Sequence, residues 1–378
     1  MAGLYRHLPF CRSKCAYCDF YSAPLDQPEI VDNYISGIIN ELSLRKEEIE
    51  EPMRTIYIGG GTPSLLSASQ LTRLFDAIKD EINFSRIEEI TIEANPEDIT
   101  KEKIDFFQSL KINRVSIGIQ SFDPEALKAV ERKHSARMSR RALEALSSSG
   151  MNYSADLIYG LPYQSPSHWE NNLKELLSYR PPHISAYLLS YEPGTRLYAR
   201  MIAGKIQEAS EQLVRTQYDI LCDITKNADY QHYEIANFSL PGKHSRHNSA
   251  YWEFRPYLGL GAGAHSFNGS ARRYNPCSYK KYIESLLNGN ICYIEEERGE
   301  YDLFNETLLT SLRTSAGLDV NRAASLLRDH KDREQFLNQI SALADTNKIR
   351  QIGNDCFVID EGEWLRADAI IRDLFLTD

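Results

Sequence analysis

Three cysteines stand close together near the start of the chain. Cys11, Cys15 and Cys18 lie in the stretch HLPFCRSKCAYCDFYS, residues 7–22, with the spacing C-x3-C-x2-C. Three thiolates bind a structural zinc ion if a residue such as His7 supplies the fourth ligand. Three thiolates can also hold three irons of a four-iron cluster, which leaves one iron without a protein ligand. The residues therefore offer two kinds of metal site, a closed zinc site or a cluster with one open corner.

The open iron gives the second kind of site a chemical use. An iron without a protein ligand can be chelated by the amino and carboxylate groups of S-adenosylmethionine, which brings the sulfonium next to the cluster. One electron from the cluster can then cleave a carbon–sulfur bond and yield a 5′-deoxyadenosyl radical. The three thiols thus predict a redox site only if the fourth corner is kept for a small molecule.

Alternating strands and helices must position these thiols. Apolar, β-branched runs predict strands at residues 3–8, 55–61, 89–95, 114–120, 153–160 and 184–190. Capping residues and amphipathic patterns predict helices at 28–49, 67–81, 100–110, 165–179 and 208–227. Repeated strand-plus-helix units are typical of a parallel β/α barrel. The fold class is therefore predicted as α/β, with a partial, TIM-like (β/α)6 barrel.

The pattern of strands and helices changes twice along the chain. Residues 1–235 carry the predicted barrel, and residues 236–299 form an aromatic and glycine-rich extension of it. In residues 300–378, short helices precede a predicted hairpin at 348–359, which favours a smaller C-terminal α+β domain of winged-helix type. The mixed charges of this domain are typical of a solvated face. We expect it to cover the barrel opening or to contact an acceptor protein.

Composition restricts the location and the partners. The net charge of -10 argues against nucleic acid as a partner, because phosphate-backbone binding needs a clustered excess of Lys and Arg. The sequence has no apolar run of about eighteen residues and no secretory signal pattern, so a cytoplasmic location is expected. The other cysteines have no paired spacing, which predicts no disulfide framework. They are Cys222, Cys277, Cys292 and Cys356.

Glycine and polar residues follow successive predicted strands, at the end where a parallel barrel builds its active site. GGGTPS, Gly59 to Ser64, follows the second strand, Glu93 ends the third, Gln120 ends the fourth and Asp156 lies in the fifth. Each feature alone is more often a turn or a helix cap. Their occurrence on four neighbouring strands favours a common site, at which glycine amides could approach a ligand.

The cysteine spacing after a first strand, with Tyr17 before the last thiol, resembles the radical S-adenosylmethionine superfamily. The stretches YRHLPFC, GGGTPS, IEANPED, SIGIQSF, ERKH, DLIYGLP and YLGLGAGAHSF are similar to its coproporphyrinogen dehydrogenase-like branch and span nearly the whole chain. The resemblance implies a [4Fe-4S] cluster held by Cys11, Cys15 and Cys18. It also implies contacts to S-adenosylmethionine from Tyr5, Tyr17, Gly60, Gly61, Thr62, Glu93, Gln120, Arg132 and Asp156.

Within this branch, one position separates two functions. The dehydrogenases resemble C-x3-C-x2-C-x-C, whereas this chain has Phe20 at the position of the fourth cysteine. Phe20 and the short segment ahead of the cysteines instead resemble the haem-chaperone family. That resemblance implies binding of the cluster, S-adenosylmethionine and haem. It also implies transfer of haem to respiratory acceptor proteins, so a peripheral association with membrane proteins is compatible with it. An oxygen-independent coproporphyrinogen III dehydrogenase is the alternative.

The segment HNSAYW, residues 247–252, is similar to the H-N-x-x-Y-W signature of the haem-chaperone family. His247 is the first candidate for a ligand to haem iron, and Tyr251 and Trp252 could pack on the porphyrin face. The alternative is a histidine satisfied by a turn, with Trp252 as part of the core. Weaker candidates for the haem ligand are His265, His7 and His244.

Overall fold

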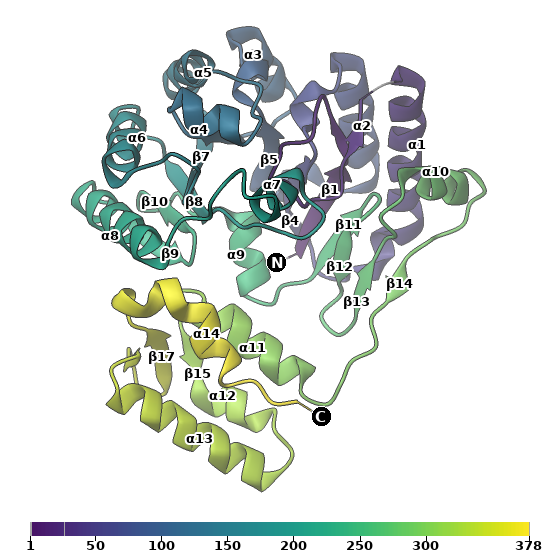
Figure 1. Cartoon of the computed structure of the whole chain (residues 1–378). Helices are drawn as coiled ribbons and strands as arrows, with labels where there is room; N and C mark the ends of the chain where they lie inside the picture. Colours follow the sequence, from purple (N-terminus) through teal and green to yellow (C-terminus); the bar gives the residue numbers. More distant parts are fainter. Residues whose placement is uncertain (1, 26, 378) are drawn as a thin grey trace.

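Six parallel strands form the centre of the structure (Figure 1). The computed structural model of the chain describes residues 2–25 and 27–377. All six predicted strands are confirmed: β1 (Ala2–Leu8), β4 (Met53–Gly60), β5 (Glu89–Ala94), β6 (Arg114–Gln120), β7 (Asn152–Tyr159) and β8 (His183–Leu188). Because neighbouring strands are parallel, all six carboxyl ends lie at one end of the sheet.

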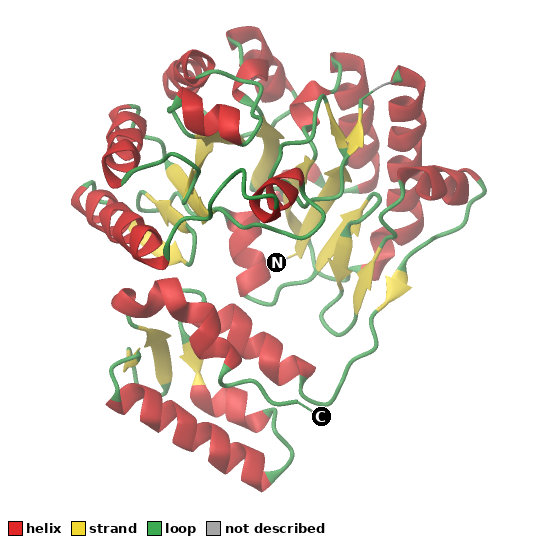
Figure 2. Cartoon of the chain, viewed as in Figure 1, coloured by secondary structure: helices red, strands yellow, loops and turns green. Residues whose placement is uncertain are grey.

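Helices cover the outer face of these strands, as Figure 2 shows. They are α1 (Pro28–Arg45), α2 (Ala68–Glu81), α3 (Lys101–Ser109), α5 (Ala136–Ser149), α6 (Pro166–Ser178) and α8 (Glu211–Asn227). The short helices α4 (Pro124–Ala129) and α7 (Arg196–Ile202) instead pack against the segment that carries the cysteines, where the Leu197 amide donates to the Ala16 carbonyl. The predicted caps set several starts. Ser67 and Gln70 form a capping box at α2, and the hydroxyls of Thr100 and Ser165 accept backbone N–H groups at α3 and α6.

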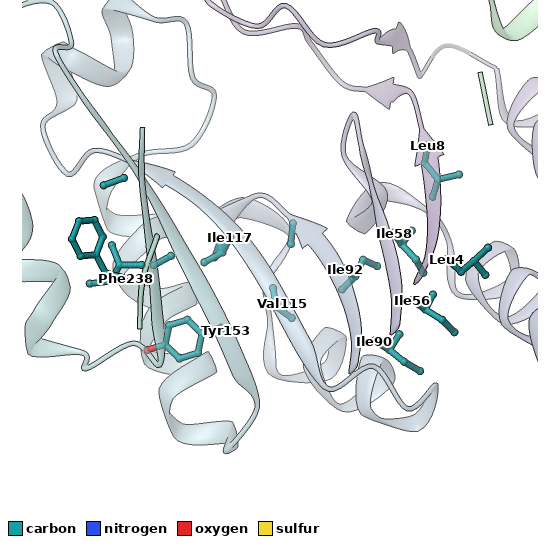
Figure 3. Packing of buried hydrophobic residues seen from close by; sticks show 14 of the residues in the cluster. Leu4, Leu8, Ile56, Ile58, Ile90, Ile92, Val115, Ile117, Tyr153 and Phe238 are labelled. Atoms are coloured by element: carbon teal, nitrogen blue, oxygen red, sulfur yellow. The ribbon is translucent and has the colours of Figure 1, made fainter. Parts of the chain in front are cut away.

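The two faces of the parallel strands differ in chemistry. Apolar side chains alternate along each strand and pack under the helices, as Figure 3 shows for Ile56, Ile58, Ile90 and Ile92. The residues between them are polar, for example Glu93 on β5 and Ser116 on β6. A parallel sheet with both faces in a core is usually a continuous apolar run. The alternation therefore places a polar interior inside the barrel.

The segment after the sixth strand extends the same sheet at both edges. On one side stand β10 (Asn237–Ser239) and β9 (Gln231–Glu234), and on the other β11 (Tyr257–Leu260), β12 (His265–Phe267), β13 (Arg272–Tyr274) and β14 (Ile294–Glu295). β11 pairs in parallel with β1, and the outer strands are antiparallel. Helix α9 (Arg246–Trp252) contacts β1 and β4, and α10 (Tyr279–Leu287) contacts α1. The result is the predicted partial barrel.

A smaller body of helices and a short sheet follows (Figure 1). It comprises α11 (Asp302–Leu312), β15 (Leu318–Asp319), α12 (Val320–Ser325), α13 (His330–Asp345), β16 (Ile349–Gln351), β17 (Cys356–Ile359) and α14 (Ala367–Arg372). The antiparallel pair β16 and β17 confirms the hairpin predicted at 348–359. Within the described residues, no helix has both the length and the apolar character that crossing a membrane requires.

Ile92→Ala is expected to destabilise the barrel by about 2–5 kcal/mol, because Ile92 is fully buried between sheet and helices. Leu44→Ala is the matched control, since Leu44 is 48% exposed on α1 and its truncation leaves no cavity. Urea unfolding followed by circular dichroism measures both variants. Equal effects of the two substitutions would contradict the core described here.

Candidate functional site

The cysteine loop is anchored at the carboxyl end of β1. Short strands β2 (Phe10–Cys11) and β3 (Ala23–Pro24) pair in parallel and close the base of the loop. The amide of Gly61 donates to the carbonyl of Leu8, and the amide of Thr62 donates to that of Phe10, both at 2.8 Å. The GGGTPS segment after β4 thus fastens the loop that carries the thiols.

The glycines of this segment permit a close approach of two backbones. A Cβ on Gly61 would lie 2.5 Å from the Phe10 carbonyl oxygen, and one on Gly59 would lie 2.8 Å from Glu93 Oε1. Gly60 has φ +116 and donates its amide to Glu93 Oε2 at 2.9 Å. These amides are used within the protein, which differs from the expectation that they face a ligand. The glycines instead allow the cysteine loop to pack on the strand ends.

A cavity of about 610 Å³ opens beneath the cysteine loop, at the carboxyl ends of β4 to β8. The structure brings all three predicted cluster ligands together in its wall. It also brings together eight of the predicted cofactor contacts: Tyr17, Gly60, Gly61, Thr62, Glu93, Gln120, Arg132 and Asp156. Tyr5 and His247 are not part of this wall. The strand-end pattern in the sequence thus corresponds to one shared cavity.

Two hydrogen-bond donors face the thiols. Arg132 Nη1 lies 3.4 Å from Cys15 Sγ, and the hydroxyl of Thr62 lies 3.6 Å from Cys11 Sγ. Burial raises the pKa of the Cys11 and Cys18 thiols, so such donors and a bound metal are needed to favour the thiolate forms. Among the described residues, no three His, Cys, Asp or Glu side chains converge as around a single ion. A cluster binds each thiolate to a different iron and does not require that convergence.

Arg132 is buried in the wall of the cavity, although its position after α4 gave no physical reason to expect it there. Its Nη2 donates to Asn95 Oδ1 at 2.9 Å and to the Gly118 carbonyl at 2.8 Å. Burial by itself lowers the pKa of Arg132, but the neighbouring Tyr17 and Cys15 raise it above the usual value. The guanidinium therefore stays charged and can attract a carboxylate at the cluster.

Two buried carboxyl groups line the same cavity. Glu93 accepts hydrogen bonds from Tyr57 Oη at 2.8 Å and from the Gly60 amide, and Asp156 accepts one from Ser116 Oγ at 3.2 Å. Burial raises the pKa of each carboxyl group to about 7. Both groups therefore titrate near neutral pH. A cationic ligand in the cavity would favour their ionised forms.

Among the described residues that line the cavity, Gln120 and Thr91 carry buried side-chain oxygens without a hydrogen-bond partner. Gln120 ends β6 with φ 62, and its Oε1 has no hydrogen-bond partner among the described residues. Buried polar atoms are almost always paired, so an unpaired acceptor in a cavity wall points to a ligand. The Gln120 amide oxygen and the two carboxyl groups can accept hydrogen bonds from an amino group of a ligand. Arg132 supplies a positive charge for a ligand carboxylate. That donor set fits S-adenosylmethionine.

The sequence patterns missed part of the cavity wall. The missed polar residues are Asn95, Arg114, Ser116, Ser154, Ser185 and Tyr187. Arg114 is buried, and its Nη2 donates to Ser154 Oγ at 2.7 Å. The alternation of polar and apolar residues in EITIEAN and RVSIGIQ is the signal that could have found several of them, because in a parallel barrel it marks the inner face.

His247 lies on α9 against the sheet, apart from this cavity. Its Nδ1 is hydrogen-bonded to Thr55 Oγ1 and its Nε2 to Tyr251 Oη, both at 2.8 Å. Burial lowers the pKa of this imidazole to about 3. Both ring nitrogens are engaged, so the structure supports the alternative of a satisfied core histidine and presents no nitrogen of His247 to haem iron. Tyr5 lies nearby and is hydrogen-bonded to His7 Nδ1 at 3.0 Å.

Gly61→Ala is expected to lower the iron bound per chain after anaerobic reconstitution, because its Cβ would collide with the base of the cysteine loop. Gly353→Ala is the control, since the nearest atom to its added Cβ would be 4.0 Å away. Iron and sulfide analysis measures the effect. Full iron loading of Gly61→Ala would contradict the role given to this packing.

The contribution of Glu93 and Asp156 to the unfolding free energy of the apo-protein is expected to fall as pH rises from about 5 to about 8, whereas buried histidines such as His247, whose pKa is lowered, contribute in the opposite direction. The folded state holds protons on Glu93 and Asp156 up to about pH 7, whereas the unfolded chain has already lost them. Asp156→Asn should therefore weaken this dependence, while Asp219→Asn, whose carboxyl group is 60% exposed, should not. Urea titrations at both pH values measure it. An unchanged slope in Asp156→Asn would contradict a raised carboxyl pKa.

Comparison with known proteins confirms the expected family. A model described as the Radical SAM superfamily matches residues 5–176. The chain is 36% identical to the haem chaperone HemW of Lactococcus lactis over 84% of this chain and 83% of that protein. It is 32% identical to HemW of Bacillus subtilis over 96% of this chain and 100% of that protein. Coproporphyrinogen III oxidase (HemN) of Escherichia coli shares the fold, with a TM-score of 0.84 and 23% identity over 99% of this chain and 90% of that one. The chain belongs to the HemW family of the radical SAM superfamily.

Proposed function

We propose that this chain is a haem chaperone that binds a [4Fe-4S] cluster, S-adenosylmethionine and haem, and transfers the haem to acceptor proteins. The observation that carries the proposal is the similarity to HemW proteins over nearly the full length of both partners. Those relatives are named haem chaperones. The cavity under the cysteine loop supports the cofactor part of the proposal independently.

The cysteine loop would hold the cluster through Cys11, Cys15 and Cys18. When bound, the cluster and S-adenosylmethionine supply one-electron cleavage of the sulfonium. Arg132 would orient the carboxylate of the cofactor, and Glu93 would hold its amino group. The walls formed by β4 to β8 would keep water from these charges and so strengthen their interactions. The site thus binds and orients the cofactor through groups that are already fixed by hydrogen bonds within the protein.

Phe20 supports a chaperone over a dehydrogenase. Its side chain occupies the position of the fourth cysteine in the dehydrogenase pattern and is 72% exposed. An exposed phenylalanine cannot bind iron or move a proton, but it can contact a flat apolar ligand. Together with Asp19 it lines both the cofactor cavity and a neighbouring aromatic cavity. Phe20 is therefore placed to contact a ligand in either cavity rather than to catalyse a reaction.

The acceptor would approach the C-terminal domain. We infer that residues 300–378 form a separate domain, whose Thr310 on α11 lines an aromatic cavity together with residues of the predicted barrel extension, 236–299. We infer that the whole chain, including the barrel of residues 1–235, is cytoplasmic. It would contact membrane-bound acceptors from the surface of the membrane. Nucleic acid is not a partner in this proposal, since the net charge is -10.

The anaerobically reconstituted protein is expected to bind haemin with a Soret band and to transfer it to an apo-haemoprotein. It is expected not to convert coproporphyrinogen III to protoporphyrinogen in the presence of S-adenosylmethionine and a reductant. Absorbance and porphyrin chromatography measure the two outcomes, with HemN as the positive control for the reaction. Conversion at a rate comparable to that of HemN, or no haem transfer, would contradict the proposal and favour a dehydrogenase.

A further inference from the structure

A second cavity, of about 590 Å³, lies beside the cofactor cavity and shares Asp19 and Phe20 with it. It is formed by β1, β11 and β12, by the end of α9, and by Thr310 of α11 in the C-terminal domain. No residue proposed above to bind the cluster lines it. A concave site with apolar walls and a few polar groups is a usual place for a small-molecule ligand.

The walls of this cavity are aromatic. Tyr251 packs edge-on against Tyr257 with ring centroids 4.6 Å apart, and Phe254 packs edge-on against Phe267 at 5.4 Å. Tyr5, Phe20, Tyr21 and Trp252 also line it. Aromatic walls bury large flat ligands because ring faces and edges pack in offset or perpendicular arrangements. The cavity therefore suits a planar aromatic macrocycle better than a sugar or a nucleotide phosphate.

Two arginines stand in the same wall. Arg272 is already engaged, because its Nε donates to Glu306 at 2.6 Å and its Nη1 to Tyr257 Oη at 3.4 Å. Within the described part of the chain, the side chain of Arg255 has one ion pair, an exposed one with Glu253 at 3.3 Å. Arg255 can therefore turn to an incoming anion at little cost. A ligand with an apolar ring and carboxylate side chains matches this combination.

One histidine of this wall is available to a metal. His7 is not, because its Nδ1 and Nε2 are bonded to Tyr5 Oη and to the Tyr21 carbonyl. The ring of His265 is exposed and has no hydrogen bond within the described residues, and its Nδ1 lies 3.8 Å from Glu296 Oε1. Metal-binding histidines commonly direct the second nitrogen at a carboxylate. This arrangement leaves His265 Nε2 for iron.

We propose that haem binds in this aromatic cavity, with His265 as the iron ligand and Arg255 at a propionate. The inference rests on the proposed haem-chaperone function and gives it a location. Asp19 and Phe20 follow the last cluster cysteine and line both cavities, so haem would lie next to the cofactor site. The HNSAYW segment then contributes Tyr251 and Trp252 as walls, while its histidine holds α9 on the sheet.

The test titrates full-length protein with haemin and follows the Soret absorbance. His265→Ala should raise the dissociation constant about tenfold and change the spectrum, and added imidazole should restore it. Arg255→Ala should weaken haemin binding but leave the affinity for haemin dimethyl ester unchanged, since the ester lacks the propionate charge. The controls are His330→Ala and Arg366→Ala, which alter exposed side chains of the C-terminal domain.

The outcomes separate the location from the function. If the unaltered chain binds haemin but both variants match their controls, the location is wrong and the chaperone function stands. If the unaltered chain does not bind haemin, the proposed function itself fails. The exposed thiol of Cys277 also lines the cavity. Loss of the spectrum in Cys277→Ser but not in His265→Ala would overturn the assignment of the iron ligand.

Discussion

The rest of the site depends on the hydrogen bonds that the buried carboxyl group of Glu93 accepts inside the barrel. This carboxyl group would be costly to bury alone, and hydrogen bonds from Tyr57 and the Gly60 amide offset that cost. The hydrogen bond from the Gly60 amide also fixes the glycine segment after β4. This segment in turn holds the cysteine loop through the amides of Gly61 and Thr62. Hydrogen bonds and close packing therefore connect the polar inner face of the sheet to the glycine segment, and the glycine segment to the loop that carries the thiols. A substitution at Glu93 is therefore expected to disturb the metal-binding loop as well.

Most of the fold could be predicted from the sequence because its signals are local. Each of these signals involves residues that are close together in the sequence. Examples are the β-branched runs, the capping residues Ser67 and Ser165, and the hairpin at 348–359. The cysteine spacing has the same property. The two edges of the sheet could not be read in this way. The pairing of β11 with β1 joins residues far apart in the chain, and no periodicity records such a partner.

The candidate site shows the same division between local and distant signals. Residues at strand ends were identified because parallel strands bring their carboxyl ends together, and the cavity confirms that they share one wall. Arg114 was missed because its role depends on Ser154 on the next strand. The HNSAYW motif leaves His247 as either an iron ligand or a satisfied core histidine, because its partner Thr55 lies 192 positions away. Burial and hydrogen-bond partners decide what a histidine does, and neither is visible in a short motif.

The central claim is that one iron of the cluster is left without a protein ligand and is kept for S-adenosylmethionine. Electron paramagnetic resonance of the anaerobically reduced protein, with and without S-adenosylmethionine labelled with ¹⁵N at its amino group, tests it most directly. The account predicts a changed spectrum on addition of the cofactor and a ¹⁵N hyperfine coupling to the cluster. A spectrum that is the same with and without the cofactor, and shows no coupling, would contradict it.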